Sequence, residues 1–281
     1  MSAGYIHSFT PHEQQRLVEQ AEFLVPWLHR HVDYASCNRV LEIGCGVGAQ
    51  LRVLSRRFPT VLFTGLDAAP EQLERAKILL ADPIAAGRAE LAHGSAYALP
   101  FPDQSFDGVF FCWVFEHLEK PLDALREAAR VLKPGGILYA SEVFNAGVFC
   151  DPPRAALADY WRAFNQLQRE FGGHPDIGLR MANLAVDAGL GDVTLRDIAP
   201  HLDGRLTPAE RKAMADYFCA IFSSGAPELL RRGRVTEELV AAMQRDFANI
   251  AAEPEAIMVY TAFQLRAVKP VPQSSLRGRA G

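Results

Sequence analysis

A glycine-rich turn between two acidic residues is the part of this 281-residue sequence that most clearly indicates chemistry. Gly44, Gly46 and Gly48 alternate along the chain, directly after an apolar run that contains Glu42. Glycine adopts positive φ and has no Cβ, so such a turn lets a ligand touch the backbone. A second apolar run ends at Asp67, about twenty residues later, a spacing at which a carboxylate accepts hydrogen bonds from ribose hydroxyls. The pattern predicts a site for an adenosine-containing ligand.

The spacing of the glycines distinguishes two kinds of adenosine ligand. Dinucleotide-binding turns follow the pattern G-x-G-x-x-G and aim a helix N-terminus at a pyrophosphate. Here the pattern is G-x-G-x-G, and Glu42 stands just before it. A carboxylate at this position repels a pyrophosphate, but it suits the ammonium and sulfonium charges of S-adenosylmethionine.

Four further motifs follow the turn in order: LPF at residues 99–101, SFDGV at 105–109, EHL at 116–118 and RVLKPGG at 130–136. With the glycine turn, this series resembles the class I S-adenosylmethionine-dependent methyltransferases over about residues 35–145. The resemblance implies an α/β fold with a doubly wound, seven-stranded, mostly parallel sheet. Its strand order would be 3-2-1-4-5-7-6, with the last strand antiparallel. It also implies S-adenosyl-L-methionine as the cofactor.

The resemblance also assigns cofactor contacts to the matching positions of this chain. The glycine turn with its preceding acid would hold the methionine end, Asp67 the ribose, and the segment after the third strand the adenine. That segment has Ser95 where many relatives have an acid, so Ser95 and the backbone of Ala96 would replace it. The predicted contacts are Tyr5, Glu42, Gly44, Cys45, Gly46, Asp67, Ala68, Gln72, Ser95, Ala96, Cys112, Trp113 and His117.

Two residues are candidate catalytic bases. Glu142 is expected at the end of the fifth strand, pointing into the cleft where it would bind or activate the acceptor. His117 has a reference pKa near 6.5 and could accept a proton at neutral pH. The alternatives are a Glu142 bound to the following loop and a His117 that positions the cofactor. No metal is predicted, and His29 and His31 are expected on the surface of one helix.

Strands and helices must alternate to position these residues. We expect a helix over residues 11–31 and strands over 40–43, 61–66, 89–93, 107–112, 136–142, 193–198 and 258–268. Helices over 47–57, 70–81 and 121–132 connect parallel strands into a doubly wound sheet. The expected segments are an N-terminal lid segment and helix (1–34), the cofactor-binding core (35–145), the rest of the core with cap insertions (146–268) and a flexible tail (269–281).

Two insertions are longer than a minimal fold needs, and they predict a helical cap over the carboxyl ends of the strands. Its helices are expected over 154–171, 176–188, 208–222 and 236–251. The aromatic content of the cap predicts an apolar or aromatic acceptor, with a subset of the rings lining its pocket. These rings belong to Tyr160, Trp161, Phe164, Tyr217, Phe218 and Phe222. The alternative is a homodimer interface formed by the same helices.

Composition narrows the class of partner. The net charge is −4, and lysine and arginine are dispersed among acids, which argues against nucleic acid. Five cysteines without a C-x-x-C pair indicate a reducing cytoplasm, and no apolar run approaches the roughly twenty residues that span a membrane. We therefore expect a cytoplasmic methyltransferase that acts on the oxygen, nitrogen or carbon of a small metabolite or natural product. The alternatives are a cofactor-binding protein without methyl transfer and a Rossmann-type NAD(P) oxidoreductase.

Overall fold

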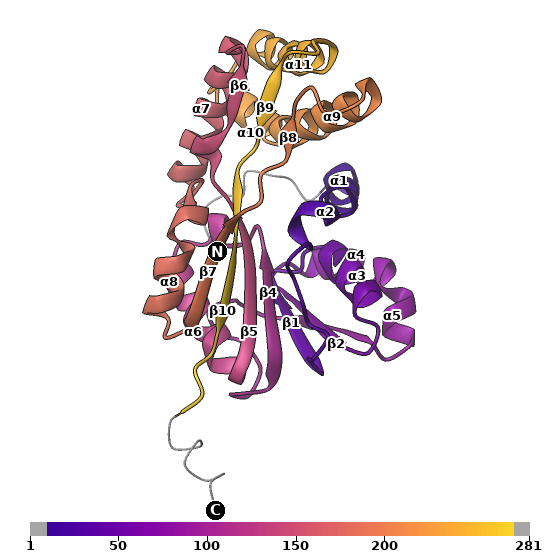
Figure 1. The fold of residues 1–281 in the computed structure, drawn as a ribbon, viewed down its shortest axis with the longest axis vertical. Helices are drawn as coiled ribbons and strands as arrows, with labels where there is room; N and C mark the ends of the chain where they lie inside the picture. Colours follow the sequence, from indigo (N-terminus) through magenta and orange to yellow (C-terminus); the bar gives the residue numbers. More distant parts are fainter. Residues whose placement is uncertain (1–9, 273–281) are drawn as a thin grey trace, which may run out of the picture.

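A seven-stranded sheet forms the centre of the computed structural model, which describes residues 10–272 (Figure 1). In spatial order its strands are β3 (Ala89–His93), β2 (Leu62–Asp67), β1 (Arg39–Ile43), β4 (Phe106–Cys112), β5 (Leu132–Val143), β10 (Ala262–Val268) and β7 (Gly191–Asp197). The first five strands are parallel, and β10 runs antiparallel to both β5 and β7. The predicted fold class is confirmed, with β7 and β10 as the sixth and seventh strands of the predicted order.

Helices cover both faces of this sheet. On one face lie α3 (Ala49–Arg57), α4 (Pro70–Leu79) and α5 (Ala81–Ala85), and on the other lie α6 (Pro121–Val131) and α8 (Met181–Asp187) (Figure 1). Successive side chains of a strand point to opposite faces. Accordingly Val40 packs with the α3 side, and Leu41 packs with α6 and α8. Because both faces are covered, the inner strands are apolar runs.

The N-terminal helix ends earlier than predicted. α1 (Pro11–Phe23) begins after Thr10, whose hydroxyl accepts a hydrogen bond from the amide of Glu13. The chain then breaks at Leu24 and continues as the short α2 (Val25–Leu28). Pro26 has no N–H to donate to the carbonyl of Glu22, which accounts for the break.

His29 is fully buried, so the prediction of a surface position was wrong for this residue. Its ring stacks on Phe110 with 5.8 Å between centroids, and its Nε2 lies 2.7 Å from Oε1 of Gln50. The helical pattern did not reveal this position because the chain turns towards the sheet where α2 ends. His31 is exposed, as predicted.

A cap stands beyond the carboxyl edge of the sheet (Figure 1). It is built from β6 (Phe149–Asp151), α7 (Ala155–Glu170), β8 (His201–Leu202), α9 (Pro208–Ser224), α10 (Ala226–Arg231), α11 (Glu237–Ala252) and β9 (Ile257–Val259). β6, β9 and β8 pair as a small antiparallel sheet that the sequence did not predict, because strands of two or three residues carry no periodic signal. The strand expected over residues 258–268 is therefore two strands, β9 in the cap and β10 in the main sheet.

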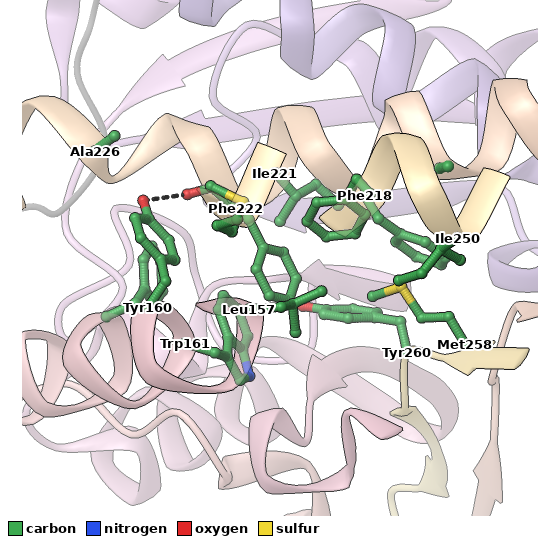
Figure 2. Close-up of a cluster of buried hydrophobic side chains, with 14 of the residues drawn as sticks. Leu157, Tyr160, Trp161, Phe218, Ile221, Phe222, Ala226, Ile250, Met258 and Tyr260 are labelled. Carbon is green, nitrogen blue, oxygen red and sulfur yellow. Dashed lines mark hydrogen bonds between the residues drawn. The ribbon is translucent and has the colours of Figure 1, made fainter. Parts of the chain in front are cut away.

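Most aromatic side chains of the cap fill its own core (Figure 2). Trp161 stacks on Phe222 with 3.9 Å between centroids, and the hydroxyl of Tyr160 donates to the carbonyl of Phe222 over 2.6 Å. Buried in the same core are Tyr160, Trp161, Phe164, Phe218 and Phe222. These five rings are therefore buried within the cap itself, which is where the predicted helical spacing placed only some of them. Tyr217 is the one member of the predicted set that keeps exposed surface.

The start of the predicted tail is tied to the sheet. The amide of Lys269 donates to the carbonyl of Gly136 over 2.9 Å, and its Nζ donates to the carbonyl of Leu132 over 2.7 Å. The prediction that the flexible tail begins at Lys269 is therefore wrong for Lys269 itself. Residues 273–281 lie outside the described part of the chain.

Candidate functional site

The glycine turn joins β1 to α3 in a backbone conformation that requires glycine. Gly44, Gly46 and Gly48 have φ of 73°, 51° and 77°. These values lie in the left-handed region, which costs other residues free energy. The amides of Gly44 and Cys45 donate to the carbonyl of Leu66 over 2.7 and 3.0 Å, so the turn is held against the end of β2.

The turn is crowded at one glycine and open at another. A Cβ at Gly44 would lie 2.6 Å from Cγ2 of Val114, so the two loops at the ends of β1 and β4 are in close contact. A Cβ at Gly46 would meet no heavy atom of residues 10–272 within 4 Å. Gly46 is therefore where a ligand can approach the backbone of the turn. Cys45 is buried beside it, as a small apolar residue would be.

Asp67 lies at the end of β2, beside the glycine turn, as predicted. One carboxylate oxygen accepts a hydrogen bond from the amide of Gly46 over 2.7 Å, and the other accepts one from Ala69 over 2.8 Å. Burial raises the pKa of Asp67, although these amides oppose the shift by favouring the charged form. Each carboxylate oxygen has two lone pairs, so both can still accept a ribose hydroxyl.

Glu42 presents an unsatisfied oxygen next to this turn. The side chain is 2% exposed, and its Oε2 has no hydrogen-bond partner. Burial and the charge of Asp67 hold the pKa of Glu42 well above its usual range. A buried carboxyl oxygen without a partner is costly unless a ligand pairs with it. This residue fits the ammonium group of S-adenosylmethionine.

Four other predicted cofactor contacts lie after β2 and β3, with Ala68, Ser95 and Ala96 in loops and Gln72 in α4. Ala68 is exposed, and Ala96 is half-buried. The hydroxyl of Ser95 accepts a hydrogen bond from the amide of Tyr97 over 3.2 Å. Gln72 is buried under α1, where its Oε1 accepts a hydrogen bond from Gln14 over 3.0 Å.

A strained turn follows β4. Trp113 has φ of 53°, in the left-handed region, although it is not glycine. Such residues concentrate at functional sites because the surrounding structure must hold them in place. The amide of Trp113 donates to the carbonyl of Ser141 over 2.9 Å, and the next two amides bind the side chain of Glu142. The turn continues as a 3₁₀ helix, η1 (Phe115–His117).

The structure contradicts the expected open position of Glu142. The side chain is fully buried, and its Oε1 accepts hydrogen bonds from the amides of Val114 and Phe115 over 2.6 and 2.7 Å. Glu142 therefore does bind a loop, as the alternative prediction held. The loop is the turn after β4, however, and not the loop that follows Glu142 itself. Burial and the charge of Glu116 raise its pKa well above the usual range. Its Oε2 has no partner among the described residues.

His117 is the more accessible of the two candidate bases. Its side chain is 21% exposed, and its Nε2 lies 3.7 Å from Oε1 of Glu116. Glu116 in turn accepts a hydrogen bond from Nε2 of Gln168 on α7 over 2.7 Å. Sequence reasoning missed Gln168. The available signal was a polar residue among the buried positions of an otherwise apolar helix face, next to Leu167.

Aromatic side chains meet where the end of β4 faces the N-terminal helices and α9. The ring of Phe23 lies 4.3 Å from that of Tyr217 and 5.8 Å from that of Trp27, in near-parallel stacks. Trp113 packs in the same group, as does Cys112, and all of these side chains are half-buried. We call Phe23, Trp27, Trp113 and Tyr217 the aromatic seam.

One predicted cofactor contact lies outside the described part of the chain. Tyr5 lies outside residues 10–272. Within these residues no group of three or more His, Cys, Asp or Glu side chains could hold a metal ion. None of their helices is both long enough and apolar enough to cross a membrane.

Comparison with known sequences identifies the domain that contains the glycine turn. Residues 41–140 match the family described as methyltransferase domain. The chain is 28% identical over 144 residues to methyltransferase GfsG of Streptomyces halstedii, a match that covers 51% of each protein. It is 32% identical over 133 residues to 27-O-demethylrifamycin SV methyltransferase of Amycolatopsis mediterranei, covering 47% of this chain and 48% of that protein. The chain thus spans about half the length of the curated relatives it matches.

Solved structures share the fold at low identity. Phosphoethanolamine N-methyltransferase 2 of Haemonchus contortus, in complex with S-adenosyl-L-methionine, has a TM-score of 0.56 and 18% identity, covering 89% of this chain and 53% of that one. The [4+2]-cyclase SpnF has a TM-score of 0.55 and 21% identity, covering 91% and 82%. These matches identify residues 41–140 as a methyltransferase domain, and the strand order shows the fold of class I S-adenosylmethionine-dependent methyltransferases that the sequence predicted.

Proposed function

We propose that this chain transfers a methyl group from S-adenosylmethionine to a small-molecule acceptor held between the sheet and the cap. The cofactor would lie along the ends of β1, β2 and β4. The observation that carries this placement is the open space above Gly46, where a Cβ would meet no heavy atom of the described residues within 4 Å. Glu42, in the adjoining strand β1, has a carboxyl oxygen without a hydrogen-bond partner among these residues, and it would face the ammonium group of the cofactor. Asp67 would hold the ribose from the end of β2.

The aromatic seam supports an acceptor with an apolar or aromatic body. Its residue Trp113 lies directly after β4, next to Val114, whose side chain lies against the glycine turn, and the rings of the seam keep exposed surface. Small-molecule sites are lined mainly by apolar and aromatic side chains with a few polar groups. The two curated relatives named above act, by their names, as methyltransferases, one of them on a rifamycin. This also favours a natural-product acceptor.

The main contribution of the protein to this reaction would be to hold the acceptor in line with the methyl group of the cofactor. The cofactor supplies an electrophilic methyl group, which the acceptor must attack in line with the bond to sulfur. The turn held by Glu142 fixes Trp113 beside this region, and the cap excludes water from it. A neutral amine or an activated carbon reacts from position alone, whereas a hydroxyl or a protonated amine needs a base that removes its proton. Because Glu142 is bound to the turn, His117 is the candidate base that remains.

Two neighbouring residues of α9 provide the test. Tyr217 faces the seam, and Phe218 faces the core of the cap. With labelled S-adenosylmethionine and a panel of phenols and aromatic amines, Tyr217→Leu should raise KM for the accepted compound several-fold at unchanged thermal stability. Phe218→Leu should lower the melting temperature, since truncating buried rings typically costs a few kcal/mol, and should leave KM unchanged. Identical KM values in the two variants would place the acceptor elsewhere.

The same assay distinguishes the alternatives. A cofactor-binding protein without methyl transfer would bind S-adenosylhomocysteine yet release none from the labelled cofactor with any acceptor. An NAD(P) oxidoreductase would be stabilised more by NADH than by S-adenosylhomocysteine in a thermal shift. Glu42 disfavours that reading because it would face a pyrophosphate.

A further inference from the structure

A cluster of buried polar side chains joins the sheet to the cap helix α7. It comprises Glu116, Glu142, Asn145, Asn165 and Gln168, each 8% exposed or less. We call these five residues the junction cluster. They come from the turn after β4, from β5 and the 3₁₀ turn that follows it (η2, Asn145–Gly147), and from α7. The cluster adjoins Cys112 and Tyr260, whose pKa values are raised by burial and by the charges of Glu116 and Glu142.

Two hydrogen bonds tie this cluster together across the junction. Nε2 of Gln168 donates to Glu116 over 2.7 Å, and Nδ2 of Asn145 donates to Oδ1 of Asn165 over 2.7 Å. Asn165 and Gln168 are three residues apart, so they share one face of α7. Asn145 follows Glu142 closely in the chain, and Glu142 feels the charge of Glu116. Each of the two bonds thus joins a residue of α7 to a residue at the carboxyl edge of the sheet.

Three oxygens of this cluster have no hydrogen-bond partner. They are Oε2 of Glu142, Oδ1 of Asn145 and Oε1 of Gln168, all buried. Because Gln168 donates its amide nitrogen to a carboxylate, its oxygen must face the other way. Buried acceptors without donors are costly, so each of these oxygens is stabilised by a group that donates a hydrogen bond to it.

The charges of the cluster specify the kind of donor. Glu116 and Glu142 bring two carboxyl groups, and within residues 10–272 neither forms an ion pair with lysine or arginine. The ring of His117 lies beside Glu116, with 3.7 Å between its Nε2 and Oε1 of Glu116. A protonated amino group carries a positive charge and three N–H donors, which equals the number of unpaired oxygens. A hydroxyl offers one donor and no charge.

We propose that the junction cluster binds a protonated amino group of the acceptor, so that the substrate class is an amine with an apolar or aromatic body. This rests on the proposed function, since the cluster borders the same edge of the sheet as the cofactor turn. The aromatic seam would contact the body of the acceptor, and the cluster its amino group. In this structure the three oxygens are covered, and α7 carries two of the five residues. The amine therefore enters when α7 moves away from the sheet.

A matched pair of ligands tests the proposal. The probes are 2-phenylethylamine, at a pH where it is protonated, and 2-phenylethanol, which has the same body and no charge. Calorimetry on the full chain saturated with S-adenosylhomocysteine should give a dissociation constant about tenfold or more lower for the amine, the effect of a charged hydrogen bond. Equal affinities would overturn the proposal.

Variants then locate the site. Glu116→Gln keeps the shape and can still accept from Gln168, and Gln168→Leu removes the polar group on α7. In both variants the two probes should bind with about equal dissociation constants, so that the preference for the amine is lost. Gln166→Leu, at an exposed position of the same helix, should keep the preference. A preference that survives in both cluster variants would overturn the location. S-adenosylhomocysteine binding reports folding in each variant.

The outcomes also separate this proposal from the proposed function. Methylation of the alcohol without any preference for the amine would refute the amine site and leave methyl transfer intact. Tight binding of the amine without turnover of any acceptor would refute the proposed function and leave the amine site.

Discussion

A methyl group added at Gly46 tests where the cofactor touches the turn. Gly46 and Gly87 have φ of 51° and 65°, and a Cβ at either position would meet no heavy atom of the described residues within 4 Å. Replacing either glycine by alanine therefore introduces the same backbone strain without a clash inside the protein. This strain costs about 1–2 kcal/mol. We expect Gly46→Ala and Gly87→Ala to lower the free energy of unfolding by similar amounts.

The two variants should differ in cofactor affinity. The amide of Gly46 binds Asp67, and the open space above Gly46 is where we place the cofactor, whereas Gly87 lies between α5 and β3, away from the turn. In Gly46→Ala the new methyl group fills that space, and we expect the dissociation constant of S-adenosylhomocysteine to rise at least tenfold, about 1.4 kcal/mol. In Gly87→Ala the constant should not change. Isothermal titration calorimetry measures the affinities, and urea unfolding measures the strain.

Two results would refute this reasoning. Equal affinity in the two variants would show that the cofactor does not approach the backbone at Gly46. A much larger loss of stability in Gly46→Ala than in Gly87→Ala would show that the two substitutions do not introduce the same strain. Weaker cofactor binding by Gly46→Ala would then reflect a distorted turn.

Further predictions follow from the carboxylates and from the buried histidine. Asp67→Asn should weaken S-adenosylhomocysteine binding about tenfold, while Asp107→Asn, which alters a carboxylate bound to backbone amides at the opposite edge of the sheet, should leave it unchanged. Glu142→Gln should lower both the free energy of unfolding and the cofactor affinity, because it weakens the hold on the turn after β4; a normal affinity with methyl transfer slowed about 100-fold would instead make Glu142 a base. Burial lowers the pKa of His29 to about 4, so the folded state keeps it neutral, and the stability present above pH ~6.5 is lost as the pH falls towards 4. Between pH ~7.5 and pH ~5 this loss is about 2 kcal/mol; urea unfolding should show that His29→Gln removes it, whereas His31→Gln at an exposed position should not.

The part of the site that the sequence predicted is the part made by backbone geometry at strand ends. Glycine spacing and the position of an acid after a strand depend on local conformation, so Gly46 and Asp67 could be placed beside each other before the fold was known. The order of the main sheet followed from the family resemblance. The short strands of the cap could not be predicted, because pairs such as β8 and β9 form only after the cap has assembled around them.

Side-chain direction was harder to predict than position. Glu142 was correctly expected at the end of β5, but the position of a residue along the chain does not reveal which groups compete for its carboxylate. Two amides of a turn that lies 27 and 28 residues earlier bind it, and no local pattern encodes that encounter. His29 shows the same limit, since its burial depends on the approach of Phe110 and Gln50 from distant elements.

The junction between cap and sheet shows where a further signal was present in the sequence. Trp161, Asn165 and Gln168 recur at the spacing of one helix face, and that face is buried. A helix that served only to cover the sheet would place apolar residues at all three positions. The two amides instead bind Asn145 and Glu116, which belong to the loops after β5 and β4. Polar residues at core-facing positions therefore mark the contact through which α7 meets the loops at the carboxyl ends of β4 and β5, next to the turn that contains Trp113.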